Sequence, residues 1–203
     1  MRCAGMNQAV SRKFIVPEKV GKNQVGVNHR SKELDPSDRP RLLASWLSPN
    51  EFRAWDDFVS KYELGTPFHG TAWKLAIERT FSHIRGKIIV LRDRDGQIVA
   101  GLPIYRVSSA ILGTRLVSAP FATVCDPLVR TKSELQQLMR PVTDLGAQVG
   151  AKYTEFRPFR NAAFLSECGL PYSAFYRQHT LSLDAEISEL RSNLSRTAVR
   201  RLL

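Results

Sequence analysis

Apolar positions recur with a helical period in three stretches of this chain. Residues 49–63, 71–83 and 132–149 place apolar side chains three and four positions apart. Ser48 and Thr131 precede two of these stretches, and a glutamate follows each of them three residues later. That spacing is typical of a capping box at a helix start. The pattern therefore predicts three amphipathic helices.

Shorter apolar runs between these helices predict strands. Residues 87–92 and 97–107 flank the tetrapeptide 93–96, whose Asp-Gly pair favours a tight hairpin turn. Other expected elements are strands over 41–46, 110–120, 153–156 and 172–183, a short helix between Asn161 and Gly169, and a last helix from Asp184 onward. We therefore expect an α/β fold with a twisted mixed sheet and flanking helices.

Composition places the chain among globular proteins. Its 203 residues are enough for one sizeable core. The apolar fraction of 43% and the charged fraction of 24% are ordinary for a globular protein. The sequence contains neither a secretory signal nor an apolar run long enough to cross a membrane. Three scattered cysteines give no disulfide framework and suit a reducing compartment. These features predict a cytoplasmic protein.

The formal net charge of +11 gathers toward the two ends of the sequence. Residues 1–41 carry nine Lys and Arg against four Asp and Glu, and residues 189–203 carry four Arg against Glu189. Such charge suits an anionic partner, or it belongs to a flexible basic tail that keeps the chain soluble. We expect residues 1–38, which lack sustained periodicity, to be a disordered basic leader.

Five segments, taken in their order and spacing, resemble the FemAB-like transferases. They are Thr66–Trp73 with Phe81–His83, Ile98–Tyr105, Leu116–Phe121, Gly150–Arg157, and the basic stretch Leu190–Arg200. The resemblance covers about residues 40–203 and is strongest to FemAB-related proteins of exosortase and exopolysaccharide systems. A departure occurs at residues 122–126, where many relatives have a glycine-rich turn.

The resemblance implies a tandem architecture and a reaction. FemAB-like proteins consist of two GNAT-like (acyl-CoA N-acyltransferase-like) domains. They move an aminoacyl or acyl group, from aminoacyl-tRNA or another acyl donor, onto an amine of a cell-envelope peptide (peptidoglycan) or exopolysaccharide precursor. By this resemblance, residues 39–183 form an N-terminal GNAT-like domain, and residues 184–203 form a basic helix leading toward a second domain.

We expect such a half to be truncated and inactive alone. The last predicted helix carries apolar residues on one face, namely Ile187, Leu190, Leu194, Ala198 and Leu202. A face of that length needs a packing surface, which the second domain would help to supply. Without that domain, we expect the helix to promote self-association through an exposed apolar patch.

Candidate substrate-binding residues come from the same segments, and none can be identified as catalytic. They are His69, Trp73, Arg157, Arg160, Arg196 and Arg200. Arg157 and Arg160 follow a predicted strand, where an α/β sheet opens its binding crevice and guanidinium groups hold phosphate or carboxylate. His69 and His83 have the chemistry of general bases. Each candidate also has a purely structural interpretation, as a core residue or as part of a solvated surface.

Other chemistry is disfavoured by the sequence. It lacks the spacing of a metal site, and Cys125 is interpreted as a buried cysteine because no base can be identified for it. The glycines of Leu145–Ala151 do not form the pyrophosphate loop of acetyl-CoA enzymes and indicate a helix end. We therefore expect no bound cofactor. The alternative to a transferase is a non-catalytic basic module that binds nucleic acid or other anions.

Overall fold

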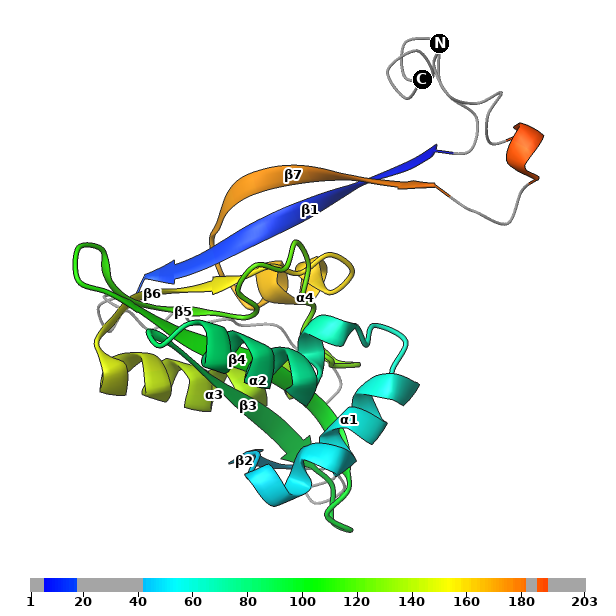
Figure 1. The fold of residues 1–203 in the computed structure, drawn as a ribbon. Coiled ribbons are helices and arrows are strands. Elements are labelled where there is room, and N and C mark those ends of the chain that lie inside the picture. Colours follow the sequence, from blue (N-terminus) through cyan, green and yellow to red (C-terminus); the bar gives the residue numbers. More distant parts are fainter. Residues whose placement is uncertain (1–5, 18–41, 182–185, 190–203) are drawn as a thin grey trace, which may run out of the picture.

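The computed structural model describes residues 6–17, 42–181 and 186–189, which form one sheet with helices on both faces (Figure 1). In chain order the elements are β1 (Met6–Pro17), β2 (Leu43–Trp46), α1 (Phe52–Lys61), α2 (Thr71–Thr80), β3 (Ile84–Arg92), β4 (Ile98–Ser109), β5 (Gly113–Val117), α3 (Lys132–Val149), β6 (Ala151–Phe156), α4 (Ala162–Glu167) and β7 (Tyr172–Leu181). Short 3-10 turns, Pro49–Glu51 and Pro67–His69, lead toward α1 and α2.

The seven strands follow the order β2-β3-β4-β5-β6-β1-β7. Neighbouring strands run antiparallel except for β5 and β6, which run parallel and are joined through α3. The predicted α/β class, with a mixed sheet and flanking helices, is confirmed. A parallel pair requires a crossover connection, which here is the 18-residue helix α3.

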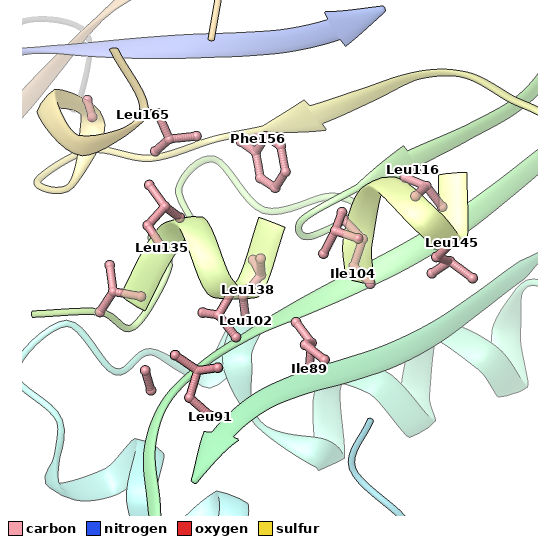
Figure 2. Close-up of a cluster of buried hydrophobic side chains, with 14 of the residues drawn as sticks. Ile89, Leu91, Leu102, Ile104, Leu116, Leu135, Leu138, Leu145, Phe156 and Leu165 are labelled. Atoms are coloured by element: carbon pink, nitrogen blue, oxygen red, sulfur yellow. The ribbon is translucent and has the colours of Figure 1, made fainter. Parts of the chain in front are cut away.

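Alternation along β3 and β4 divides the core between the two faces of the sheet. Ile89 and Leu102 pack against α3 in the largest cluster, where Leu135, Leu138 and other α3 residues meet the sheet (Figure 2). The neighbouring residues point the other way: Ile88 packs with α1 and Tyr105 packs with α2. This period of two is the geometry of an extended strand that is buried on both faces.

The predicted helix starts are confirmed at residue level. The backbone N–H of Ser48 donates to the Glu51 carboxylate at 2.9 Å, and the Thr131 hydroxyl accepts from the backbone N–H of Glu134 at 3.2 Å. At the other end of α3, Gly150 takes a left-handed conformation with φ of 61°. That conformation suits glycine because it has no Cβ. The interpretation of residues 145–151 as a helix end is therefore confirmed.

One glycine is required by close packing between layers. A Cβ at Gly101, on β4, would lie 2.4 Å from the Trp55 ring and 2.9 Å from the carbonyl oxygen of Ile89. Trp55 is fully buried and comes from α1. The bare backbone of Gly101 therefore lets the indole lie directly on the sheet.

The expectation of a disordered leader is wrong for residues 6–17. This segment forms β1, which pairs with β6 over Phe14–Pro17 and with β7 over Met6–Phe14. Its hydrogen-bonding partners lie more than 130 residues away in the sequence, so no local pattern could reveal the strand. The other residues of the expected leader lie outside the described residues.

Most of the C-terminal expectations concern residues 190–203. Residues 190–203, including Arg196 and Arg200, lie outside the described residues, while Ile187 is 79% exposed. The basic helix and its self-association therefore stay predictions. Among the residues that the structure does describe, no helix has both the length and the hydrophobicity needed to cross a membrane.

Candidate functional site

The parallel strands β5 and β6 end side by side, and the loops that follow them form the candidate site. Val117 lies opposite Glu155, and the backbone N–H of Ser118 donates to the Glu155 carbonyl at 2.9 Å. Beyond this point one loop runs from Ser118 to Thr131 and the other follows Arg157. In open α/β sheets, ligands bind in the crevice at the carboxyl ends of such strands.

A buried carboxylate ties the two loops together. Asp126 is 5% exposed, and its Oδ1 accepts from the backbone N–H groups of Phe159 and Asn161, both at 2.8 Å. The Asn161 amide in turn donates to the carbonyl oxygens of Pro127 at 2.8 Å and Val129 at 3.2 Å. Burial raises the pKa of Asp126, and the backbone donors partly oppose that shift.

His69 lies beneath the same loops and is fully buried. Its Nε2 is 2.8 Å from the carbonyl oxygen of Asp126, and its Nδ1 is 3.1 Å from the backbone nitrogen of Thr66. A carbonyl only accepts, so Nε2 carries the proton, and Nδ1 accepts from the Thr66 N–H. Burial lowers the pKa of His69, which favours the neutral ring. His69 is therefore a structural residue with both nitrogens already engaged.

Cys125 does not form a nucleophilic pair with this histidine. Its Sγ lies 3.4 Å from His69 Nε2, yet that nitrogen donates to Asp126 and has no free lone pair to take a thiol proton. The cysteine is fully buried, and burial raises the pKa of its thiol. A reactive cysteine needs a lowered pKa and access to solvent. The interpretation of Cys125 as a buried cysteine is confirmed.

The burial of His69 predicts an acid-sensitive fold. Its pKa is lowered in the folded chain relative to the ordinary value of 6.5, so between these two values the unfolded chain binds more protons. The free energy of unfolding should therefore fall as the pH drops below about 6.5, with a slope of up to about 1.4 kcal/mol per pH unit. Urea denaturation between pH 5 and 8 measures this slope.

A substitution separates His69 from other titrating groups. His69→Gln should flatten the profile, because glutamine carries no group that titrates in this pH range. The raised pKa of Asp126 acts in the opposite direction, since it makes stability fall as the pH rises above 3.8. An identical slope in wild type and His69→Gln would contradict the prediction.

The predicted arginines do not act as one group. The Arg157 guanidinium donates to the Glu155 carboxylate and to the carbonyl oxygen of Ala122, each at 2.6 Å, and its side chain keeps 31% exposure. Arg160 is 62% exposed and pairs with Glu63 at 2.8 Å. Its surroundings are a separate hollow between α1 and α4. Arg157 is thus rigidly held, whereas Arg160 is a surface residue.

Arg157 lines a pocket of about 360 Å³ on the face of the sheet that carries α2. The other lining residues are His83, Ile84, Val107, Arg115, Val117, Pro120 and Phe121. Ile84, Val107 and Val117 are buried and form an apolar floor. The rim therefore combines two guanidinium groups and an imidazole with that floor.

Phe121 gives the rim of this pocket an unusual backbone. It adopts φ of 61°, and it is the non-glycine residue with positive φ among the described residues. Its ring is 62% exposed and stacks on Phe81 with centroids 4.9 Å apart. Strained residues of this kind cluster at functional sites, where the surroundings hold them in place.

Two buried donors lie in the cluster that forms the pocket floor. The Trp73 indole nitrogen and the Tyr105 hydroxyl have no hydrogen-bond partner, and both side chains belong to the cluster of Ile84, Val107 and Val117. Leaving a buried donor unpaired costs about 1–3 kcal/mol. Trp73 also packs edge-on against Phe68, with centroids 5.0 Å apart, so its predicted place on an apolar stripe is confirmed.

Sequence patterns do not predict that Arg115 and Phe121 line this pocket. Arg115 lies on β5 two residues before Val117, so the strand places both on the same face, but an isolated arginine in a short strand carries no signal. Arg196 and Arg200 lie outside the described residues. Among the described residues, no group of three His, Cys, Asp or Glu side chains could hold a metal ion.

Comparisons with known proteins identify structural neighbours but no family. No family model matches the sequence, and no curated protein matches it. A GCN5-related N-acetyltransferase from Sphaerobacter thermophilus is 13% identical with a TM-score of 0.49. The matched region covers 88% of this chain and 54% of the acetyltransferase chain. Saccharomyces cerevisiae N-myristoyltransferase with bound myristoyl-CoA and inhibitors is 12% identical with a TM-score of 0.45, covering 87% and 52%.

A third neighbour has no assigned function. It is a conserved protein from Staphylococcus epidermidis, 11% identical with a TM-score of 0.45, covering 86% of this chain and 62% of its own. This chain thus spans less than two thirds of the length of all three neighbours. Likenesses this weak assign no role to any residue of this chain.

Proposed function

We propose that this chain is a GNAT-like acyltransferase domain whose pocket between Arg115 and Arg157 receives the anionic part of a substrate. The single observation that carries the proposal is this pocket at the carboxyl ends of the parallel pair β5 and β6. Guanidinium groups bind carboxylate and phosphate in bidentate fashion, and the apolar floor suits an acyl or side-chain group.

The proposed chemistry is acyl transfer to an amine. The amine nitrogen attacks the carbonyl carbon of an activated ester or thioester, so a C–N bond forms and the C–O or C–S bond breaks. The proton lost by the amine ends on the leaving alcohol or thiol. Such a reaction depends on positioning and on stabilising the developing oxyanion, and it needs no covalent nucleophile. The proposed chemistry therefore does not require His69, whose ring nitrogens are hydrogen-bonded, or the buried Cys125 to react.

The finer proposal concerns the substrate. By its resemblance to FemAB-like transferases, the chain would act on a cell-envelope peptide or polysaccharide precursor and take its acyl group from aminoacyl-tRNA or another acyl donor. Arg157 is held by Glu155 and Ala122, which fixes its guanidinium at the pocket before any ligand arrives. Arg115, which is half-buried, would supply the second cation.

Binding is the sharpest test, because a half-transferase can bind without turning over. We expect a cell-wall precursor peptide with a free amine and a carboxylate to bind the full chain saturably by calorimetry. Arg115→Gln should weaken that binding by about tenfold, the equivalent of about 1.4 kcal/mol. The matched control is Arg53→Gln, an exposed arginine on α1, which should change it less than about twofold.

Turnover forms the second arm of the test. Mass spectrometry of the peptide after incubation with aminoacyl-tRNA, or with acetyl-CoA, identifies the donor by the mass added. Peptide binding that is equally weakened by both substitutions would contradict the assigned pocket. Absence of saturable peptide binding, together with RNA affinity that falls steeply with salt, would favour the alternative of a basic module that binds nucleic acid.

A further inference from the structure

A second hollow lies on the opposite face of the sheet, beside the last turn of α3. Its volume is about 580 Å³, and its lining residues are Arg85, Lys87, Ile104, Arg106, Leu145, Gln148 and Val149. Figure 2 shows Leu145 of α3 near Leu116 and Ile104 in the core. Leu145 and Ile104 also line the hollow. The transferase pocket faces α2 instead, so the two hollows are separated by the sheet.

Three cations converge on this hollow from neighbouring strands. Arg85 of β3 lies directly opposite Arg106 of β4, and Lys87 follows two residues later on the same face of β3. Directly opposed residues of an antiparallel pair have Cβ atoms about 5 Å apart, and diagonal neighbours remain within reach of long side chains. A single phosphate or diphosphate group therefore lies within reach of all three.

The partners found for these cations are neutral. An Arg85 nitrogen donates to the carbonyl oxygen of Ile84 at 2.7 Å, and the Lys87 ammonium lies 5.2 Å from the centre of the Trp46 ring. The ion pairs of the described residues involve other cations: Lys74, Arg92, Arg157 and Arg160. Like charges placed directly opposite each other destabilise a sheet, so this pair calls for an explanation beyond folding.

The end of α3 offsets only part of this charge. A helix C-terminus carries the equivalent of about half a negative charge, whereas Arg85, Lys87 and Arg106 carry three positive ones. The remaining wall is apolar, from Ile104, Leu145 and Val149, with the Gln148 amide beside it. The hollow thus joins a concentrated positive charge to an apolar surface in one concave space.

We propose that this hollow binds a small phosphorylated molecule. Arg85, Lys87 and Arg106 hold the phosphate oxygens, and the apolar part of the molecule packs on Leu145 and Val149. Guanidinium groups match the geometry of phosphate oxygens, and a diphosphate would engage both arginines at once. This site is independent of the proposed acyl transfer, because it uses the other face of the sheet and none of the same residues.

Phenyl phosphate is the test ligand, because it carries a phosphate on an apolar ring. Titrated into the full chain labelled with ¹⁵N, it should produce saturable shifts in the amide signals of β3, β4 and the last turn of α3. Inorganic phosphate should bind the same residues more weakly, and neutral benzyl alcohol should shift them only slightly. Equal affinity for phenyl phosphate and inorganic phosphate would contradict the role given to the apolar wall.

A double variant isolates the opposed arginines. Arg85→Gln with Arg106→Gln should weaken phenyl phosphate binding by at least about tenfold. The control, Arg53→Gln with Arg79→Gln, removes the same charge from exposed positions on α1 and α2 and should change the affinity less than about twofold. Equal weakening in both double variants would show a general charge effect and overturn the site.

Two further results would overturn the proposal. The Arg85 and Arg106 double variant should unfold at the same urea concentration as wild type or a higher one, because it removes two opposed like charges. A lower urea midpoint with unchanged phenyl phosphate binding would show that these arginines only stabilise the C-terminal end of α3. Shifts at the same residues that saturate with an RNA oligonucleotide and not with phenyl phosphate would replace the small ligand by a polyanion.

Discussion

Replacement of Asp126 by alanine should lower the free energy of unfolding by about 2–5 kcal/mol. The substitution removes the acceptor for the backbone N–H groups of Phe159 and Asn161, which lie half-buried in the loop that follows β6. Each buried donor left unpaired costs about 1–3 kcal/mol. The loss is larger than a surface substitution would give, because the same carboxylate connects the loops that follow β5 and β6.

The matched control is Asp126→Asn, which keeps an oxygen acceptor at the same position. We expect it to cost less than about 1.5 kcal/mol, partly because a neutral amide does not carry the buried charge whose desolvation raises the pKa of the carboxyl. Urea denaturation at pH 7 gives both values. If alanine and asparagine proved equally mild, the Asp126 oxygen would not be the link between the loops.

Trp55→Ala should destabilise the chain by about 3–5 kcal/mol, the usual cost of removing a buried aromatic side chain. Trp55 is fully buried, packs against Gly101, and donates from its indole nitrogen to the carbonyl oxygen of His69 at 2.8 Å. Its loss opens a cavity between α1 and the sheet. It also releases the 3-10 turn that carries His69.

Trp55→Phe separates the two contributions. Phenylalanine keeps much of the ring but leaves the His69 carbonyl without its donor, so we expect a cost of about 1–3 kcal/mol. Thermal unfolding of both variants, with Asp57→Ala on the exposed face of α1 as the control, provides the comparison. An alanine variant within about 1 kcal/mol of wild type would contradict the interlayer role of Trp55.

Local patterns predicted most of the fold because its helices carry their own signals. Ser48 opens a capping box, the Thr131 hydroxyl caps the first turn of α3, and the stripe along α3 is the face that packs on the sheet. The hairpin between β3 and β4 also has its turn chemistry in place, since Asp93 Oδ1 accepts from the backbone N–H of Gln97 at 2.8 Å. Such features depend on residues close in sequence.

The candidate site could be predicted only in part, because it depends on distant contacts. Arg157 was found from its position after a strand, and the structure places it in the pocket. No sequence pattern indicates Arg115. The predicted substrate-binding residue His69 instead has both ring nitrogens bonded, one to Thr66 and the other to Asp126, 57 residues away. Pairings at such separations leave no periodic trace in the sequence.

The insertion of β1 between β6 and β7 has a consequence for biosynthesis. Residues 14–17 leave the ribosome before their partners at 153–156, which are made about 140 residues later. At about 5–20 residues per second, the segment waits roughly 7–30 s before it can pair. During that interval β2 to β5 can already assemble, so the sheet grows from its β2 edge, β1 joins after β6, and β7 joins last. An unpaired strand is a target for chaperones in the meantime, and the nascent chain should depend on them until β7 emerges.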